Sequence, residues 1–131
     1  MYLLDTNICI ALLNENPQAV TKFNRFFSQC YLSIIVVAEL YKGVYCSQQV
    51  AKNLDILAQF TELLPVEPFG IEAAIEFGKI QSELRKIGKP TGEFDALIAA
   101  VACSRDDILV TNNIKDFINI PNLKLDNWLE S

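Results

Sequence analysis

The stretch from Met1 to Leu13, MYLLDTNICIALL, decides the fold class. Its residues Tyr2 to Asp5 form a short strand-like segment, and an apolar helical pattern through Ile8 and Leu12 follows without a linker. A buried strand that passes directly into a helix is typical of a β-α-β unit, in which the strands are parallel. Asp5 therefore stands where the first predicted strand ends and the first helix begins.

The rest of the chain alternates short apolar segments with longer amphipathic ones in the same way. Strands are predicted at about residues 2–5, 30–33, 63–66 and 108–111, with a further edge strand at 123–125. Helices are predicted at about residues 8–12, 17–28, 35–46, 50–61, 71–87 and 91–102, with a helical turn at 112–117. This pattern predicts one three-layer α/β/α domain, residues 1–131, with a four- or five-stranded parallel sheet.

The composition is that of a soluble protein with a core of its own. Hydrophobic residues make up 51% of the 131 residues, and no segment approaches the roughly 20 apolar residues of a membrane span. The four cysteines are scattered, so we expect reduced, mostly buried thiols rather than a disulfide or zinc framework. The N-terminal segment lacks the basic start and apolar run of a secretory signal. We therefore expect a cytoplasmic protein without membrane contact.

The sequence contains no histidine, and this excludes several kinds of hydrolytic site. Serine–histidine–acid and cysteine–histidine mechanisms require an imidazole, and metal-free ribonucleases usually use one as a proton shuttle. Carboxylates remain, and an all-oxygen site suits Mg²⁺ or Mn²⁺. The net charge of −5 is compatible with a nucleic-acid substrate, because such a site concentrates negative charge where its cations bind. Candidates for phosphate contacts, each of which could also be a solvated surface charge, are Lys42, Arg85, Lys86, Lys89 and Lys115.

Three carboxylates are candidates for that site. Asp5 lies at the carboxyl end of a predicted parallel strand, where open α/β sheets bind ligands, although it could instead cap the following helix. Glu39 interrupts the apolar segment 34–40, and a carboxylate there is unfavourable unless it is paired or bound to a cation. Asp95 lies in the first turn of an alanine-rich helix, on the face of Ile98. Glu39 could instead be a partly exposed helix position, and Asp95 could serve only the helix dipole.

The end of the fourth predicted strand offers further oxygen ligands. Residues 111–116, TNNIKD, place a hydroxyl, two amides and a carboxylate within one short turn, although a turn or cap role is the default for such residues. If this turn converges with Asp5, the cluster would bind Mg²⁺ or Mn²⁺ through oxygen atoms alone. The ion would activate a water for in-line attack on a phosphodiester bond.

The sequence resembles the PIN-domain ribonucleases, and in particular the VapC toxins of bacterial toxin–antitoxin pairs. The resemblance rests on LDTN (4–7), SIIVVAELYKG (33–43), GKPTGEFDALIAAVA (88–102) and LVTNNIKDF (109–117). It implies a PIN-like fold and metal-binding acids at Asp5, Glu39 and Asp95. Members of the family often place a fourth acid where this chain has Asn113, so Asn113 and Asp116 are both candidates for the fourth metal ligand. Residues expected to support the acids are Thr6, Asn7 and Thr111.

The same resemblance implies partners and products. It implies a homodimer, Mg²⁺ or Mn²⁺ as the cofactor, and a small VapB-like antitoxin whose tail enters the acidic site. It also implies inhibition of translation through hydrolysis of RNA to a 3′-hydroxyl and a 5′-phosphate. Several members with a similar GxPxGxFD segment cut initiator tRNA, which makes tRNA a candidate substrate.

The sequence is also compatible, in part, with two other classes of protein. A PIN-like module that binds RNA or protein without cleaving it is the main alternative, because Asn113 stands where many members have an acid. A phosphatase or receiver domain fits less well. Such phosphatases need a second aspartate two residues after the first, where this chain has Asn7, and a receiver domain needs paired acids after its first strand.

Overall fold

Strands and helices alternate along the chain in the predicted order. The computed structural model describes residues 1–130, so Ser131, the last residue of the predicted domain, lies outside the described residues. The strands are β1 (Tyr2–Leu4), β2 (Cys30–Ser33), β3 (Val66–Glu67), β4 (Ile108–Val110) and β5 (Lys124–Asp126). The helices are α1 (Thr6–Leu13), α2 (Pro17–Phe26), α3 (Ile34–Tyr45), α4 (Val50–Glu62), α5 (Ile71–Lys86), α6 (Glu93–Arg105) and α7 (Ile114–Phe117), with a 3₁₀ turn η1 (Phe27–Gln29).

The strands form one five-stranded parallel sheet in the order β3-β2-β1-β4-β5. The chain runs outward from β1 through β2 to β3, and then returns to β4 on the other side of β1. The strand order therefore reverses between β1 and β4. Open α/β sheets bind ligands at this kind of reversal, outside the carboxyl ends of the strands.

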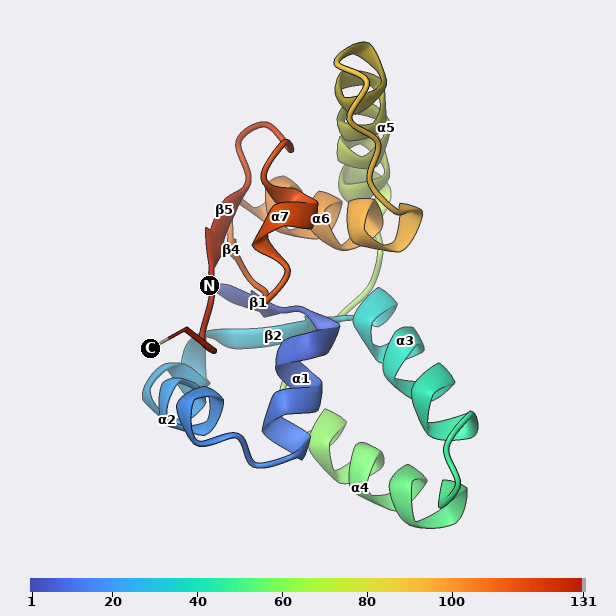
Figure 1. Ribbon diagram of the computed structural model, residues 1–131, viewed down its shortest axis with the longest axis vertical. Helices are drawn as coiled ribbons and strands as arrows, with labels where there is room; N and C mark the ends of the chain where they lie inside the picture. Colours follow the sequence, from blue (N-terminus) through green and yellow to red (C-terminus); the bar gives the residue numbers. More distant parts are fainter. Residues whose placement is uncertain (131) are drawn as a thin grey trace.

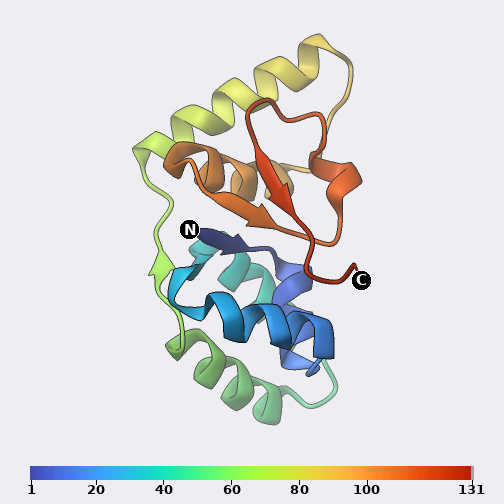
Figure 2. The ribbon, with the colours of Figure 1, turned by 90° about the vertical axis from the view of Figure 1, so that its left-hand side faces the viewer.

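Helices cover the sheet in the predicted three-layer arrangement. Figure 1 shows β1 and β2 in the middle of the molecule, with α5 projecting at one end and the α3–α4 pair at the other. Figure 2 shows α5 and α6 on one side of the strands and α1 to α4 on the other. Leu3, Leu4, Leu109 and Val110 are all 0% exposed. The central strands are thus buried on both faces, as a parallel sheet requires.

Local sequence signals set several element boundaries. Pro17 opens α2, and the side chain of Ser33 accepts the Ile35 N–H at 3.0 Å as the predicted cap of α3. The third strand differs from the prediction of residues 63–66, because β3 comprises only residues 66 and 67. Pro65 has no N–H to donate to a ladder, so regular pairing begins after it.

The cysteines are free thiols, as expected, but not all of them are buried. Cys9 and Cys30 lie in the interior, Cys103 is half-buried and Cys46 is exposed. Burial raises the pKa of Cys30 to about 11, which keeps the thiol protonated and unreactive. Within residues 1–130, no helix combines the length and apolar character needed to cross a membrane.

The buried alanines of α6 allow close packing against neighbouring elements, and this can be tested. Ala99 is 0% exposed, so Ala99→Leu should lower the free energy of unfolding by about 1–3 kcal/mol because the larger side chain must displace packed neighbours. The same substitution at Ala74, on the exposed side of α5, should change the free energy of unfolding by less than about 0.5 kcal/mol. Urea unfolding followed by the fluorescence of Trp128 measures both. Equal effects of the two substitutions would contradict close packing at Ala99.

Candidate active site

Asp5 is fixed at the end of β1 by its main chain and by its side chain. Its backbone N–H donates to the carbonyl oxygen of Val110 at 2.9 Å, which holds it beside β4. Its Oδ1 accepts the Thr6 N–H at 2.8 Å, so Asp5 caps α1 as the sequence allowed. Asp5 is only 3% exposed. Its carboxylate is therefore buried in one orientation.

The second carboxylate oxygen of Asp5 accepts hydrogen bonds from two of the predicted supporting residues. Thr111 Oγ1 donates to it at 2.7 Å and Asn7 Nδ2 at 3.1 Å. Asn7 Oδ1 in turn accepts the Asn112 N–H at 2.9 Å, and Thr111 Oγ1 accepts the Asn113 N–H at 3.0 Å. This network joins the ends of β1 and β4. The turn after β4 therefore converges with Asp5.

Glu39 and Asp95 reach the same region from α3 and α6. The third predicted supporting residue, Thr6, donates its hydroxyl to Glu39 Oε1 at 2.8 Å. Asp95 is half-buried, and burial raises its pKa to about 6, with the negative charges of Asp5, Asp116 and Glu39 as further causes. The charges of Asp5, Asp116 and Glu39 all act on Asp95, so these carboxylates lie in its neighbourhood.

The acids of this site have no positive side chain paired with them in the described chain. Burial also raises the pKa of Asp5 above its ordinary value, and the charge of Asp116 adds to this, while hydrogen bonds from Thr111, Thr6 and Asn7 act in the opposite direction. Among residues 1–130, none of the four carboxylates forms an ion pair. Buried charges in proteins are normally paired or bound to a metal ion, so this cluster is suited to a cation.

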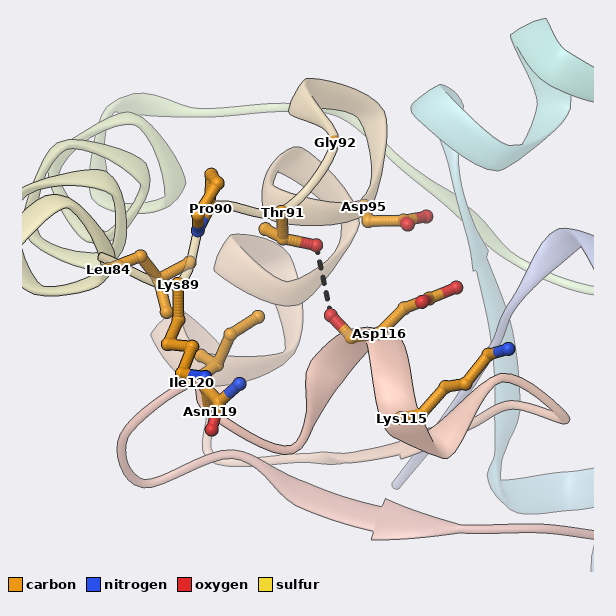
Figure 3. A pocket seen from close by; sticks show the side chains of 10 residues that line it. All are labelled: Leu84, Lys89, Pro90, Thr91, Gly92, Asp95, Lys115, Asp116, Asn119 and Ile120. Atoms are coloured by element: carbon orange, nitrogen blue, oxygen red, sulfur yellow. Dashed lines mark hydrogen bonds between the residues drawn. The ribbon is translucent and has the colours of Figure 1, made fainter. Parts of the chain in front are cut away.

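The structure separates the two candidates for the fourth acid position. Asp116 lines the same pocket as Asp95, and Figure 3 shows the two carboxylates extending in the same direction. Asn113 has an exposed side chain and, in the described chain, does not line this pocket. The structure thus places Asp116 in one pocket with Asp95, whereas Asn113 contacts Thr111 through its backbone N–H.

The donor set fits a hard divalent cation that retains part of its water shell. In the described part of the chain, no three acidic side chains are already arranged to enclose an ion by themselves. Mg²⁺ is usually bound by one or two carboxylates together with water and substrate phosphate. Carboxylate oxygens favour Mg²⁺ or Mn²⁺ over metals that prefer thiolate or imidazole ligands. Asp5 and Asp95, with Glu39 and Asp116 beside them, match that mode of binding.

The predicted phosphate contacts do not all reach the site. Lys89 and Lys115 line the same pocket as two of the acids. Lys42 is exposed on α3, one turn after Glu39. Arg85 and Lys86 are exposed at the end of α5 and do not line that pocket.

One residue near the acids was not singled out from the sequence. Thr91 Oγ1 donates to the carbonyl oxygen of Asp116 at 2.9 Å, and the dashed line in Figure 3 marks this bond. It ties the loop between α5 and α6 to α7 across 25 residues of sequence. No local pattern signals a contact of this separation, because a threonine in a loop is ordinary turn chemistry.

The chain is similar to known proteins over nearly its whole length. Residues 2–123 match the PIN domain family. A tRNA(fMet)-specific endonuclease VapC of Salmonella typhimurium is 35% identical over 128 residues, which are 97% of each chain. Ribonuclease VapC2 of Haemophilus influenzae is 37% identical over 129 residues, 98% of each chain.

Solved structures agree with these sequence relatives. DNA-bound VapBC from Salmonella typhimurium is 35% identical and superposes with a TM-score of 0.93, covering 97% of each chain. VapBC2 from Rickettsia felis, bound to a DNA fragment from its promoter, is 36% identical with a TM-score of 0.91 and covers 97% of this chain and 98% of that one. The likeness therefore extends over sequence and fold together.

The raised pKa of Asp95 predicts how stability depends on pH in a chelating buffer. The folded protein keeps a proton on Asp95 up to about pH 6, whereas the unfolded chain releases it near the ordinary value of 3.8. A raised carboxyl pKa contributes stability at low pH that is lost as the pH rises through the folded-state value. The free energy of unfolding of the wild type should therefore fall relative to that of Asp95→Asn between about pH 4 and pH 7.

Urea unfolding of both proteins at several pH values, with EDTA present, measures this difference. Asp5 is common to both proteins, so its own titration largely cancels in the comparison. A difference in the free energy of unfolding that stays constant, or that grows in favour of the wild type as the pH rises, would contradict the raised pKa of Asp95.

Proposed function

The chain belongs to the PIN domain family and, within it, to the VapC ribonucleases. On that basis we propose that it is a metal-dependent endoribonuclease and the toxin of a type II toxin–antitoxin pair. The proposal is carried by the convergence of Asp5, Glu39, Asp95 and Asp116 at the reversal of strand order. Bound Mg²⁺ or Mn²⁺ would activate water and neutralise charge on the leaving oxygen during hydrolysis of RNA.

The residues around the acids have separate tasks in this proposal. Asn7 and Thr111 hold the Asp5 carboxylate in one orientation through Oδ2, and Oδ1, which accepts only the Thr6 N–H, keeps a lone pair for a further ligand. Thr6 positions Glu39 through its hydroxyl. Asp95 and Asp116 are more accessible and can face a cation together with the RNA phosphate.

The partners follow from the relatives. The solved relatives are VapBC complexes, so we propose a small VapB-like antitoxin as the partner of this chain in the cytoplasm. A homodimer is also proposed. Ile71 and Ile75, one turn apart on α5, are 76% and 53% exposed, and an apolar surface of this kind suits a second copy.

The relatives also guide the choice of substrate. One of them is named for tRNA(fMet), so we propose RNA as the substrate class and tRNA as the first RNA to test. Cleavage of RNA within cells would inhibit translation. The non-cleaving module that Asn113 left open receives no support from relatives that are named ribonucleases.

Cleavage of RNA should depend on a divalent cation and on Asp95. With Mg²⁺ or Mn²⁺ the wild type should cleave a mixture of RNAs that includes tRNA, and a chelator should stop it. Asp95→Asn should slow cleavage by about a hundredfold or more, because it removes a charged ligand of the ion. Asp55→Asn makes the same change at an exposed acid of α4 and should leave the rate unchanged. The measurement is the initial rate on labelled RNA.

These variants also separate the alternatives. Metal-dependent cleavage that survives Asp95→Asn would contradict the proposed site. Binding of RNA without cleavage, by wild type and variant alike, would favour a non-cleaving module.

The fourth position can be assigned by a matched pair of substitutions. Asp116→Asn should slow cleavage by about tenfold or more, because it removes a charge that faces Asp95. Asn113→Ala should have a smaller effect, because it removes no charge and its exposed side chain lies outside the pocket that Asp95 and Asp116 line in the described chain. The rate is measured across a series of Mn²⁺ concentrations. The reverse order of effects would place the fourth ligand at Asn113.

A further inference from the structure

A polar pocket of about 250 Å³ adjoins the acids. It lies between the loop that joins α5 to α6 and the short helix α7, with Asp95 and Asp116 on its lining. Figure 3 shows its other polar side chains, of which Lys89 and Asn119 lie near one another. The pocket therefore connects the acidic cluster with a group of hydrogen-bond donors.

The accessible wall of this pocket suits a phosphate and a sugar better than a base. Its large apolar residues Leu84 and Ile120 are only 1% and 5% exposed, so they offer little surface for stacking. Unstacked bases are usually held against aromatic or arginine planes, and this lining has none. An ammonium, an amide and a hydroxyl, from Lys89, Asn119 and Thr91, are groups that contact phosphate and ribose.

Lys89 is available for a phosphate. Within residues 1–130 it forms no ion pair, whereas Lys86, three residues earlier, is paired with Glu83 at 3.3 Å. In Figure 3 the Lys89 side chain turns toward Asn119, while Asp95 and Asp116 extend away from it. The Lys89 side chain and the two acids thus occupy different parts of one pocket, while Lys115 extends on the side of the acids.

The two walls of the pocket are joined. The hydrogen bond from Thr91 to the carbonyl oxygen of Asp116 connects the α5–α6 loop with α7. This bond limits how far the loop can move from the acids. The distance between Lys89 and the acidic cluster is therefore restricted. A ligand that contacts both must carry its charged groups at a matching spacing, and the regularly spaced phosphates of a nucleic-acid strand meet this requirement.

We propose, on the basis of the proposed function, that this pocket is a subsite for the phosphate and ribose of the nucleotide next to the cleaved bond. Lys89 contacts the phosphate, and the acids with their cation act on the neighbouring phosphodiester. The ligand is a single RNA strand, recognised here through its backbone rather than through its base.

A scan with neutral phosphates tests the subsite. The bond that the wild type cleaves is first mapped on an RNA substrate. Oligonucleotides of that sequence, each with one methylphosphonate in place of a phosphate, are then bound to the Glu39→Gln protein in a chelating buffer, so that hydrolysis is absent. Glu39 is not a residue of this pocket. Fluorescence anisotropy gives the affinity.

A methylphosphonate at one position beside the cleaved bond should weaken binding by about three- to tenfold relative to the oligonucleotide with all its phosphates. This loss of affinity at one position is the positional effect. Adding Lys89→Met should abolish that difference, and Lys89→Arg should preserve it. A plot of the logarithm of the binding constant against the logarithm of the salt concentration has a negative slope. Lys89→Met should reduce the size of that slope by about 0.7, the value for one phosphate contact on a single strand. Lys86→Met removes the same charge outside the pocket and should leave the positional effect intact.

Other results would overturn the subsite. An unchanged positional effect in Lys89→Met, or equal losses of affinity in the Lys89 and Lys86 variants, would show that Lys89 contacts no particular phosphate. Cleavage by the wild type, measured in parallel, keeps the two proposals apart. Cleavage without a positional effect overturns only the subsite, whereas no cleavage of any RNA with Mg²⁺ or Mn²⁺ overturns the proposed function.

Discussion

The parallel pairing of Leu4 with Val110 places Asp5 and Thr111 side by side at the end of the sheet. Every other part of the acidic site is arranged around that contact. A shift of register by one residue would turn the buried leucines of β1 toward the opposite face and separate Asp5 from its hydrogen-bond donors. The burial of Leu3, Leu4, Leu109 and Val110 thus fixes the position of a carboxylate as well as the core.

The site concentrates negative charge that the fold does not itself neutralise. Burial and repulsion raise the pKa values of Asp5 and Asp95, while the neighbouring side chains stabilise Asp5 with hydrogen bonds rather than with a positive charge. Functional sites commonly store unfavourable interactions of this kind, which a ligand then relieves. A divalent cation would offset the repulsion, and it would at the same time supply the chemistry of phosphodiester hydrolysis.

Much of the fold could be predicted from local patterns, because short apolar strands and amphipathic helices have distinct periodicities. Asp5 could be predicted as a site residue because it follows a predicted parallel strand, and open α/β sheets bind ligands at the carboxyl ends of their strands. The sequence could not show that Asp116, rather than Asn113, shares a pocket with Asp95, because this placement depends on how α7 packs beside α6. The bond from Thr91 to Asp116 and the pocket around Lys89 were also beyond prediction, since they join segments that are distant in sequence and carry no periodic signal.

The central claim is that the acids at the reversal of strand order bind a divalent cation. Diffraction from crystals of the wild type grown with Mn²⁺ tests this most directly, because the anomalous signal of manganese locates the ion without assumptions about activity. If these acids bind the ion, an anomalous peak lies within coordinating distance of the carboxylates of Asp5 and Asp95, and it disappears in Asp95→Asn crystals. Manganese bound only elsewhere on the molecule, or a peak beside Asp5 that is unchanged in the variant, would contradict this claim.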